Sequence, residues 1–279
     1  MNQSDFDFIA GLLKQTSGLV LTPEKAYLLE SRLMPVARKF GFDNLDNLVA
    51  SVRKDRSKQL IDEITDAMTT NESLFFRDTK PFEQLKAFII PTLLKARSGT
   101  KSIRIWSAAS SSGQEPYSIA MCLKDMAAQL VGWDIKIVAT DISGEMLNRA
   151  REGKYTQFEV QRGLPIATLV KYFNQEGENW QIDQSIRSMV DYQPFNLLDD
   201  PRSLGQFDIV FCRNVLIYFD QPTKSEVLER MTHVLANDGV LLLGAAETVL
   251  GITDRFVPLQ GQRGIYEMTQ SQSTQLKTG

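Results

Sequence analysis

The chain has 279 residues, of which 43% are hydrophobic, and carries a net charge of −3 with an isoelectric point near 5.4. This length fits one large or two ordinary domains with a sizeable core, and the acidic balance argues against a protein whose main task is to bind the phosphate backbone of nucleic acids. The longest apolar runs are far shorter than a membrane span, and the polar start lacks the features of a signal peptide. We therefore expect a cytoplasmic protein without membrane insertion.

The two cysteines and the single histidine give little support for a disulfide or a metal site. Cys122 lies in a predicted helix and Cys212 in a predicted buried strand, so both are interpreted as small core residues. His233 also lies within a predicted helix and is interpreted as structural. We expect no metal cofactor.

The first part of the chain shows helical patterns and no strand signal. Ser4 is a plausible N-cap for a first helix, and Thr22 followed by Pro23 begins a second one. Helices are predicted, in chain order, over 4–18, 22–41, 43–52 and 57–68.

The stretch from Thr69 to Asp78 interrupts this helical pattern before another predicted helix over 81–95. It is polar at first and then contains two adjacent aromatic residues and a cation. One interpretation makes Phe75 and Phe76 core anchors and Arg77 a surface cation. The other is a linker that carries chemistry.

The segment 103–120 has the pattern of a strand, a loop of small residues and a helix. Such loops hold nucleotide-like ligands at the carboxyl edge of open α/β sheets, because free helix N–H groups point into the crevice. The glycine-rich and lysine-containing phosphate motifs are absent, and Glu115 at the start of the helix would repel a pyrophosphate. We therefore predict a nucleoside-like ligand with a cationic group, and S-adenosylmethionine fits.

A second strand is predicted over 134–141 and ends in Asp141. An acid at this position can accept both ribose hydroxyls of an adenosine. It can also serve as the N-cap of the helix that follows, and the two roles are compatible.

The rest of the chain continues the α/β alternation, with one exception. Residues 153–187 fit it poorly and are predicted to form an inserted antiparallel β element. Asn196, Asn214 and Tyr218 follow the next two strands and should converge with Glu115 and Asp141, because the carboxyl ends of parallel strands share one edge of a sheet. The remaining elements are strands over 189–195, 207–213 and 240–244, a turn at 237–239, a helix from Asp220, a closing hairpin over 256–268 and a disordered tail over 269–279.

Three segments together resemble the chemotaxis receptor methyltransferases of the CheR family. They are Thr-Thr-Asn-Glu-Ser-Leu-Phe-Phe-Arg-Asp from Thr69, Ser-Ala-Ala-Ser-Ser-Ser-Gly-Gln-Glu-Pro-Tyr-Ser from Ser107, and Phe-Cys-Arg-Asn-Val-Leu-Ile-Tyr-Phe from Phe211. The resemblance implies an α/β fold, the class I S-adenosylmethionine-dependent methyltransferase fold, with a Rossmann-like mixed sheet whose last strand is antiparallel. The implied organisation is an N-terminal helical domain with linker over 1–78, a methyltransferase domain over 79–268 with a small antiparallel β-subdomain inserted at about 153–187, and a tail over 269–279.

The same resemblance implies roles for individual residues. Arg77 and Tyr218 would lie beside the reaction centre, and Arg32 and Arg38 would meet acidic receptor helices. Ser73 stands where a threonine is common, and Pro35 stands near a position that is often basic. The implied cofactor contacts are Asn71, Ser73, Arg77, Glu115, Asp141, Asn196, Leu197, Asn214 and Val215.

The implied reaction moves a methyl group from S-adenosylmethionine to glutamate side chains of methyl-accepting chemotaxis receptors, leaving S-adenosylhomocysteine. A receptor glutamate is already ionised at neutral pH, so the transfer needs no general base. The expected partners are the cytoplasmic signalling helices of these receptors, contacted by a monomer that binds no nucleic acid.

Two other functions are compatible with such a crevice. One is an N-methyltransferase for nucleic acids or small molecules, but no Pro-Pro pair follows Asn214 as it does in amino-methylating enzymes. The other is a non-catalytic adaptor that senses S-adenosylmethionine, and the presence of both Arg77 and Tyr218 favours catalysis over it.

Some members of the family bind a receptor's C-terminal pentapeptide through the inserted subdomain. Here the segment 173–180, where the turn of that subdomain is expected, is short and contains two glutamates and one glycine. Two acids would repel a terminal carboxylate, although salt screens exposed charges within about 10 Å. We hypothesise that this protein does not use the pentapeptide.

Overall fold

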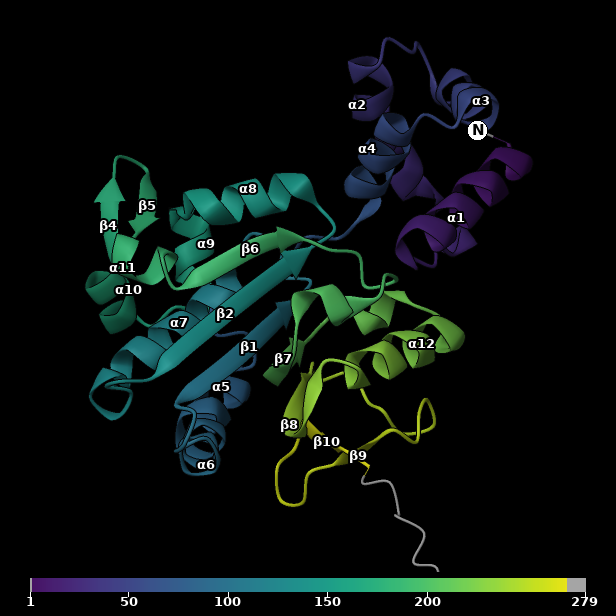
Figure 1. Ribbon diagram of the computed structural model, residues 1–279. Coiled ribbons are helices and arrows are strands. Elements are labelled where there is room, and N and C mark those ends of the chain that lie inside the picture. Colours follow the sequence, from purple (N-terminus) through teal and green to yellow (C-terminus); the bar gives the residue numbers. More distant parts are fainter. Residues whose placement is uncertain (1, 270–279) are drawn as a thin grey trace, which may run out of the picture.

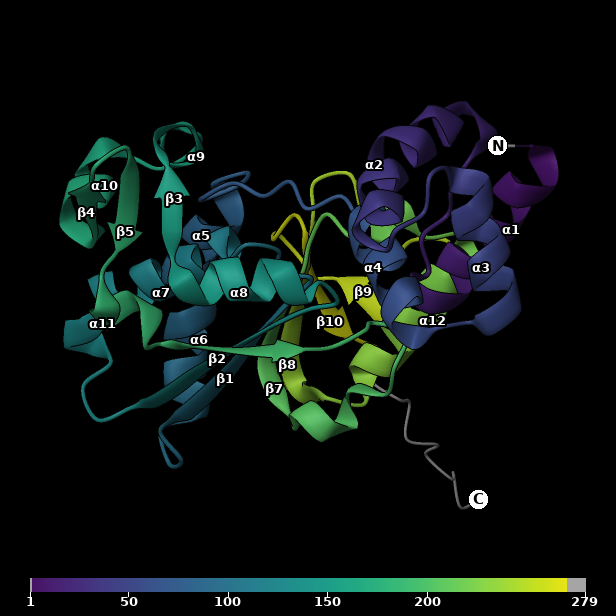
Figure 2. The same cartoon turned by 90° about the horizontal axis from the view of Figure 1, so that it is seen from above.

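The computed structural model describes residues 2–269. It contains a helical N-terminal domain, a seven-stranded sheet with helices on both faces, and a separate three-stranded sheet (Figures 1 and 2). The fold class predicted from the sequence is confirmed. The predicted disorder of the tail concerns residues that, from 270 onward, lie outside the described part of the chain.

The helical domain is built from amphipathic helices whose apolar faces meet in a core of their own. Asn2, rather than the predicted Ser4, is the N-cap of the first helix, because the Asn2 side chain accepts a hydrogen bond from the backbone N–H of Asp5 at 2.9 Å. The helices are α1 (Gln3–Ser17), α2 (Ala26–Lys39, after the 3₁₀ turn Pro23–Lys25), α3 (Leu45–Asp55) and α4 (Lys58–Met68).

The helix predicted over 81–95 is present, but it is not one regular helix. It consists of α5 (Lys80–Gln84), a π-helical turn (Leu85–Ile89) and α6 (Ile90–Ala96). Pro91, near the start of α6, has no N–H to donate to the carbonyl four residues earlier. The helix therefore widens into a π-helical turn just before this proline.

The large sheet has the order β6-β2-β1-β7-β8-β10-β9. The first five strands in this order are parallel, while β10 runs antiparallel to both β8 and β9, so the predicted closing hairpin is confirmed. The strands are β1 (Ser102–Ala108), β2 (Asp134–Asp141), β6 (Val190–Pro194), β7 (Phe207–Cys212), β8 (Leu235–Leu243), β9 (Phe256–Pro258) and β10 (Ile265–Met268).

One strand boundary differs from the prediction. The turn expected at 237–239 lies inside β8, which begins at Leu235 and shifts register against β7. Two hydrogen bonds between the Arg97 guanidinium and the Asp238 carboxylate hold this irregular stretch against the end of α6. A contact with a residue so distant in sequence left no signal in the local pattern.

Alternate side chains of the strands belong to two separate cores, one on each face of the sheet. Ile137 and Phe211 pack in the core under α5, α6, α7 (Gln114–Asp125) and α8 (Gly144–Glu152). Val138 and Val210 pack on the opposite face with α12 (Gln221–Thr232). Across residues 2–269, no helix combines the length and apolarity needed to cross a lipid bilayer.

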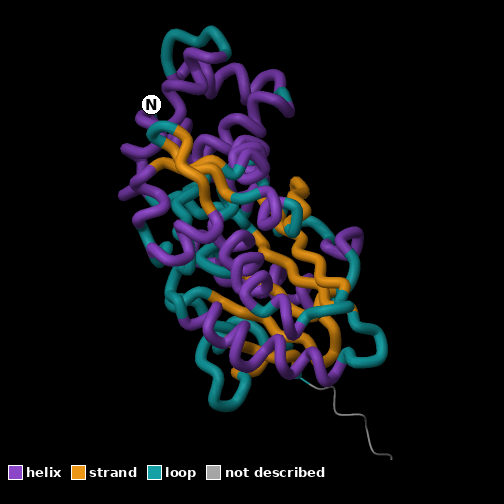
Figure 3. The backbone as a smooth tube through the Cα atoms, turned by 90° about the vertical axis from the view of Figure 1, so that its left-hand side faces the viewer, coloured by secondary structure: helices purple, strands orange, loops and turns teal. Residues whose placement is uncertain are grey.

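The three-stranded sheet lies within the predicted insertion. Its order is β3-β5-β4 and all pairings are antiparallel, as expected. Figure 3, in which this sheet faces the viewer, shows its short strands apart from those of the large sheet. The elements are β3 (Lys154–Thr156), α9 (Gln157–Gln161), α10 (Ile166–Tyr172), β4 (Phe173–Glu176), β5 (Asn179–Ile182) and α11 (Gln184–Arg187).

The helical domain lies beside the carboxyl ends of the parallel strands (Figure 1). The side-chain amide of Asn196, after β6, donates to the carbonyl of Thr16 in α1 at 2.7 Å. The backbone N–H of Val20 donates to the carbonyl of Tyr218 at 2.9 Å. The loops after β6 and β7 are therefore fixed between the sheet and the helical domain.

Candidate active site

The loop between β1 and α7 places the backbone of small residues at the carboxyl edge of the sheet. Ala109 and Ser111 have positive φ angles of 54° and 50°, and Gly113 has a φ of 95°. A Cβ on Gly113 would lie 2.7 Å from the Tyr192 hydroxyl, so no larger residue fits. Such conformations cluster at ligand sites.

Asp141, at the end of β2, organises the neighbouring loops. Its carboxylate accepts hydrogen bonds from the backbone N–H groups of Ser111 at 2.7 Å and Ser143 at 2.9 Å. Burial raises the pKa of Asp141, and these hydrogen bonds oppose the shift. Ser143 is the N-cap of α8, so the N-cap interpretation of Asp141 is wrong. A carboxylate accepts about four hydrogen bonds, so Asp141 retains acceptor capacity.

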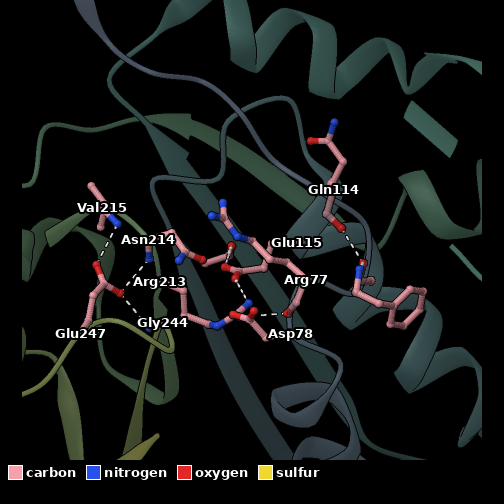
Figure 4. Close-up of polar contacts among 12 residues, drawn as sticks. Arg77, Asp78, Gln114, Glu115, Arg213, Asn214, Val215, Gly244 and Glu247 are labelled. Atoms are coloured by element: carbon pink, nitrogen blue, oxygen red, sulfur yellow. Dashed lines mark hydrogen bonds and ion pairs between the residues drawn. The ribbon is translucent and has the colours of Figure 1, made fainter. Parts of the chain in front are cut away.

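A buried ion-pair cluster lies beneath the crevice (Figure 4). Arg213, whose side chain is 1% exposed, donates to Glu115 at 2.9 Å and to Asp78 at 2.7 Å. It also donates to the backbone carbonyl of Arg77 at 2.9 Å, while Ser107 donates to Glu115 at 2.8 Å. Burial raises the pKa of Glu115, and Arg213 and Ser107 counteract that rise. The cluster connects β1, α7 and β7 to the linker.

The linker over 69–78 is held at several points. Phe75 is fully buried against the rings of Tyr155 and Phe173, so its interpretation as a core anchor is confirmed. The Ser111 hydroxyl donates to the carbonyl of Asn71 at 2.7 Å. Arg77 is half-buried and lines the crevice, so it is not simply a surface cation.

The loop after β7 is shaped by Glu247. Asn214 has a positive φ of 60°, and the backbone N–H groups of Asn214 and Val215 donate to the Glu247 carboxylate at 2.7 and 3.0 Å (Figure 4). The loop continues into a 3₁₀ turn (Leu216–Tyr218). This turn carries Tyr218 to the edge of the crevice.

These elements enclose a crevice with about 950 Å³ of empty space, part of it open to solvent. Ser17 and Leu19 from the helical domain complete its wall. All predicted cofactor and reaction-centre residues line it together: Asn71, Ser73, Arg77, Glu115, Asp141, Asn196, Leu197, Asn214, Val215 and Tyr218. His233, at the end of α12, is not among the lining residues.

The two arginines predicted to meet a partner do not line this crevice. Arg32 donates to the carbonyls of Met68 at 2.8 Å and Thr69 at 3.0 Å, and so ties α2 to the end of α4. The Arg38 side chain is exposed and makes no hydrogen bond or ion pair with another residue of the described range 2–269. Of the pair, Arg38 has the side chain that is available to a partner.

Sequence reasoning assigned no role to Arg213 or Glu247. Arg213 directly follows β7, in which every residue is buried, and a cation at the end of such a strand is a signal for a buried ion pair. Glu247 follows β8 without any periodic or motif signal. Three of its four hydrogen-bond donors lie about thirty residues away in the chain, and only the fold brings them to the Glu247 carboxylate.

The strand order, the antiparallel closing strands and the crevice at the carboxyl edge define the class I methyltransferase fold. Comparison with protein-family models is more specific. The model for the CheR methyltransferase SAM-binding domain matches residues 71–265, and the model for the CheR methyltransferase all-alpha domain matches residues 4–69. The chain belongs to the CheR methyltransferase family.

Curated relatives cover nearly the whole chain. Chemotaxis protein methyltransferase 1 of Pseudomonas aeruginosa is 43% identical over 94% of this chain and 96% of its own length. Chemotaxis protein methyltransferase Cher2 of Pseudomonas putida is 42% identical over 94% and 96%. The chemotaxis protein methyltransferase of Vibrio parahaemolyticus is 40% identical over 95% and 96%.

Proposed function

We propose that this protein transfers the methyl group of S-adenosylmethionine to glutamate side chains of chemotaxis receptors in the cytoplasm. One observation carries the proposal: a single crevice combines the buried acids Asp141 and Glu115 with Arg77 and Tyr218. The acids suit a cationic nucleoside, and the arginine and tyrosine suit a carboxylate acceptor. The names of the relatives support receptor methylation as the biological setting.

The residues present fit the cofactor. Asp141, with free acceptor capacity at the end of β2, would hold the ribose hydroxyls, and Glu115 would attract the ammonium group. Leu197 and Val215 supply apolar surface in the same crevice. When bound, S-adenosylmethionine supplies an electrophilic methyl group on a positively charged sulfur.

The chain's own task is to align the acceptor and to exclude water. A glutamate carboxylate is ionised at neutral pH, so no residue must remove a proton. The Arg77 guanidinium and the Tyr218 hydroxyl would replace the water around that carboxylate and fix its direction. Correct alignment can supply about 7–11 kcal/mol of the barrier.

Replacing Asp141 with alanine should weaken cofactor binding much more than it alters the fold. The substitution removes the proposed ribose acceptor, and two hydroxyls would then be buried without a partner, at a cost of about 1–3 kcal/mol. Calorimetric titration with S-adenosylhomocysteine measures the loss, and circular dichroism controls for the fold. An affinity equal to that of the unaltered protein would remove Asp141 from the site.

The receptor surface is proposed to include Arg38 directly and Arg32 indirectly. Arg38 presents a free cation at the end of α2, where acidic receptor helices could approach. Arg32 would act by holding α2 against α4 through its bonds to Met68 and Thr69.

The inserted subdomain is proposed not to bind a receptor pentapeptide. Its β4–β5 hairpin closes through a two-residue turn of Gly177 and Glu178, with Glu176 at the end of the edge strand. Acids at this short turn would repel a terminal carboxylate. We expect calorimetry with a receptor's C-terminal pentapeptide to give no heat of binding at micromolar concentration. Binding that is abolished by substitutions within 173–180 would show the opposite.

Transfer assays with labelled cofactor test the proposed function. The purified protein is incubated with receptor-bearing membranes and, separately, with nucleic acid. We expect label only on the receptors, in a form that mild base releases, as methyl esters require. Base-stable label, or label on nucleic acid, would refute the proposal.

A further inference from the structure

The Glu247 carboxylate lies between two chain segments and accepts hydrogen bonds from both (Figure 4). One oxygen accepts from the backbone N–H groups of Asn214 and Gly244, each at 2.7 Å. The other accepts from Val215 at 3.0 Å and from Ile217 at 3.3 Å. Hydrogen bonds to an ionised acceptor are about twice as strong as neutral ones, so the carboxylate is a firm anchor for this backbone.

The local sequence makes room for this acid. The positive φ of Asn214 turns the following N–H groups toward a common point. A Cβ on Gly244 would lie 2.7 Å from a Glu247 carboxylate oxygen and 2.8 Å from the Asn214 side-chain nitrogen. Both features permit the contact between the end of β8 and the loop after β7.

The anchored segment is the one that lines the crevice. Asn214, Val215 and Tyr218 all belong to the crevice wall, whereas Glu247 does not. The 3₁₀ turn that ends at Tyr218 has no side-chain cap from its own N-cap residue. Glu247 therefore supplies, from a distant part of the chain, the acceptor that this turn lacks.

We propose that Glu247 is a positioning residue for methyl transfer, which acts by fixing the backbone of 214–218 and through it the Tyr218 hydroxyl. The inference rests on the proposed function for the role of Tyr218. The effect of Glu247 on the shape of the cofactor crevice does not depend on the proposed function, because Asn214 and Val215 line that crevice and belong to the same anchored segment.

The test uses the full-length Glu247→Gln variant. An amide keeps one acceptor oxygen and turns an NH₂ group toward N–H donors, so at least two of the four hydrogen bonds are lost. We expect kcat to fall about 30- to 100-fold with little change in the KM for receptor, and the affinity for S-adenosylhomocysteine to fall about 5- to 10-fold. Glu229→Gln, which removes a partly exposed acid on α12 paired with Arg255, is the matched control and should leave all three unchanged.

A double-mutant cycle separates positioning from general stability. In the Tyr218→Phe background, Glu247→Gln should lower kcat by only a few-fold, because the hydroxyl that it misplaces is already missing. An undiminished loss in that background, or an unchanged kcat in the single variant, would overturn the proposal. If the wild-type protein methylates no receptor, the proposed function fails, whereas the calorimetric loss of affinity still tests the anchor.

A second variant guards against a folding defect in Glu247→Gln. Gly244→Ala keeps the acid but forces a methyl group into its contact with Asn214. It should reproduce the losses in kcat and affinity. Normal values in a folded Gly244→Ala protein would contradict the inference.

Discussion

Replacing Arg213 with alanine is expected to lower the free energy of unfolding by about 3–5 kcal/mol, because it leaves the Glu115 carboxylate buried without its cation. The Arg213 side chain is 1% exposed and that of Glu115 is 12% exposed, so the carboxylate stays largely out of bulk water when the guanidinium is removed. The substitution also frees Asp78 and the carbonyl of Arg77. Urea unfolding followed by circular dichroism measures the change.

Lys58→Ala is the matched control for this prediction. Lys58 forms an ion pair with Asp62 on the surface of α4, where its side chain is 87% exposed, and such pairs contribute about 0–1 kcal/mol. A loss of stability in Arg213→Ala no greater than in Lys58→Ala would mean that the buried cluster is not a structural anchor.

Replacing Arg77 with alanine should leave the protein folded but reduce turnover on the order of 10²- to 10³-fold, as loss of a stabilising group at a reaction centre does. Arg77 lines the crevice, and among residues 2–269 its guanidinium makes only a long hydrogen bond of 3.4 Å, to the carbonyl of Glu72. Its side chain is therefore free to meet a substrate carboxylate. Steady-state kinetics with receptor-bearing membranes measures the effect.

Arg77→Lys discriminates between charge and geometry. An ammonium keeps the charge but cannot reproduce the planar fork with which a guanidinium holds a carboxylate, so this variant should also turn over slowly. Thermal unfolding of both variants controls for the fold. Turnover close to wild type in either of them would return Arg77 to a surface role.

The general architecture and the crevice residues were predictable because they depend on local rules. Strands such as β2 and β7 contain clusters of β-branched and other apolar residues, and polar residues at the carboxyl ends of parallel strands must share one edge. Asp141 and Asn214 could therefore be assigned to one crevice without knowledge of the tertiary structure. The segments that start at Thr69, Ser107 and Phe211 then indicated the family, and the family resemblance supplied the linker residues Asn71 and Arg77.

The features that could not be predicted depend on contacts between distant residues. Arg32 carries the same charge as Arg38, but only the fold shows that the Arg32 guanidinium bonds to carbonyls at the end of α4. The acceptors that pair with Arg213, and three of the four N–H groups that donate to Glu247, lie in distant segments of the chain. No periodicity within a segment reports such partners.

The most direct test is mass spectrometry of receptor peptides after incubation with the purified protein and S-adenosylmethionine. The residues of this crevice predict one added methyl group on glutamate side chains, lost on mild alkaline treatment and strongly reduced when Arg77→Ala replaces the wild-type protein. Methylation on lysine, arginine or a nucleobase, or receptor glutamates that remain unmodified while the cofactor is consumed, would contradict the proposed function.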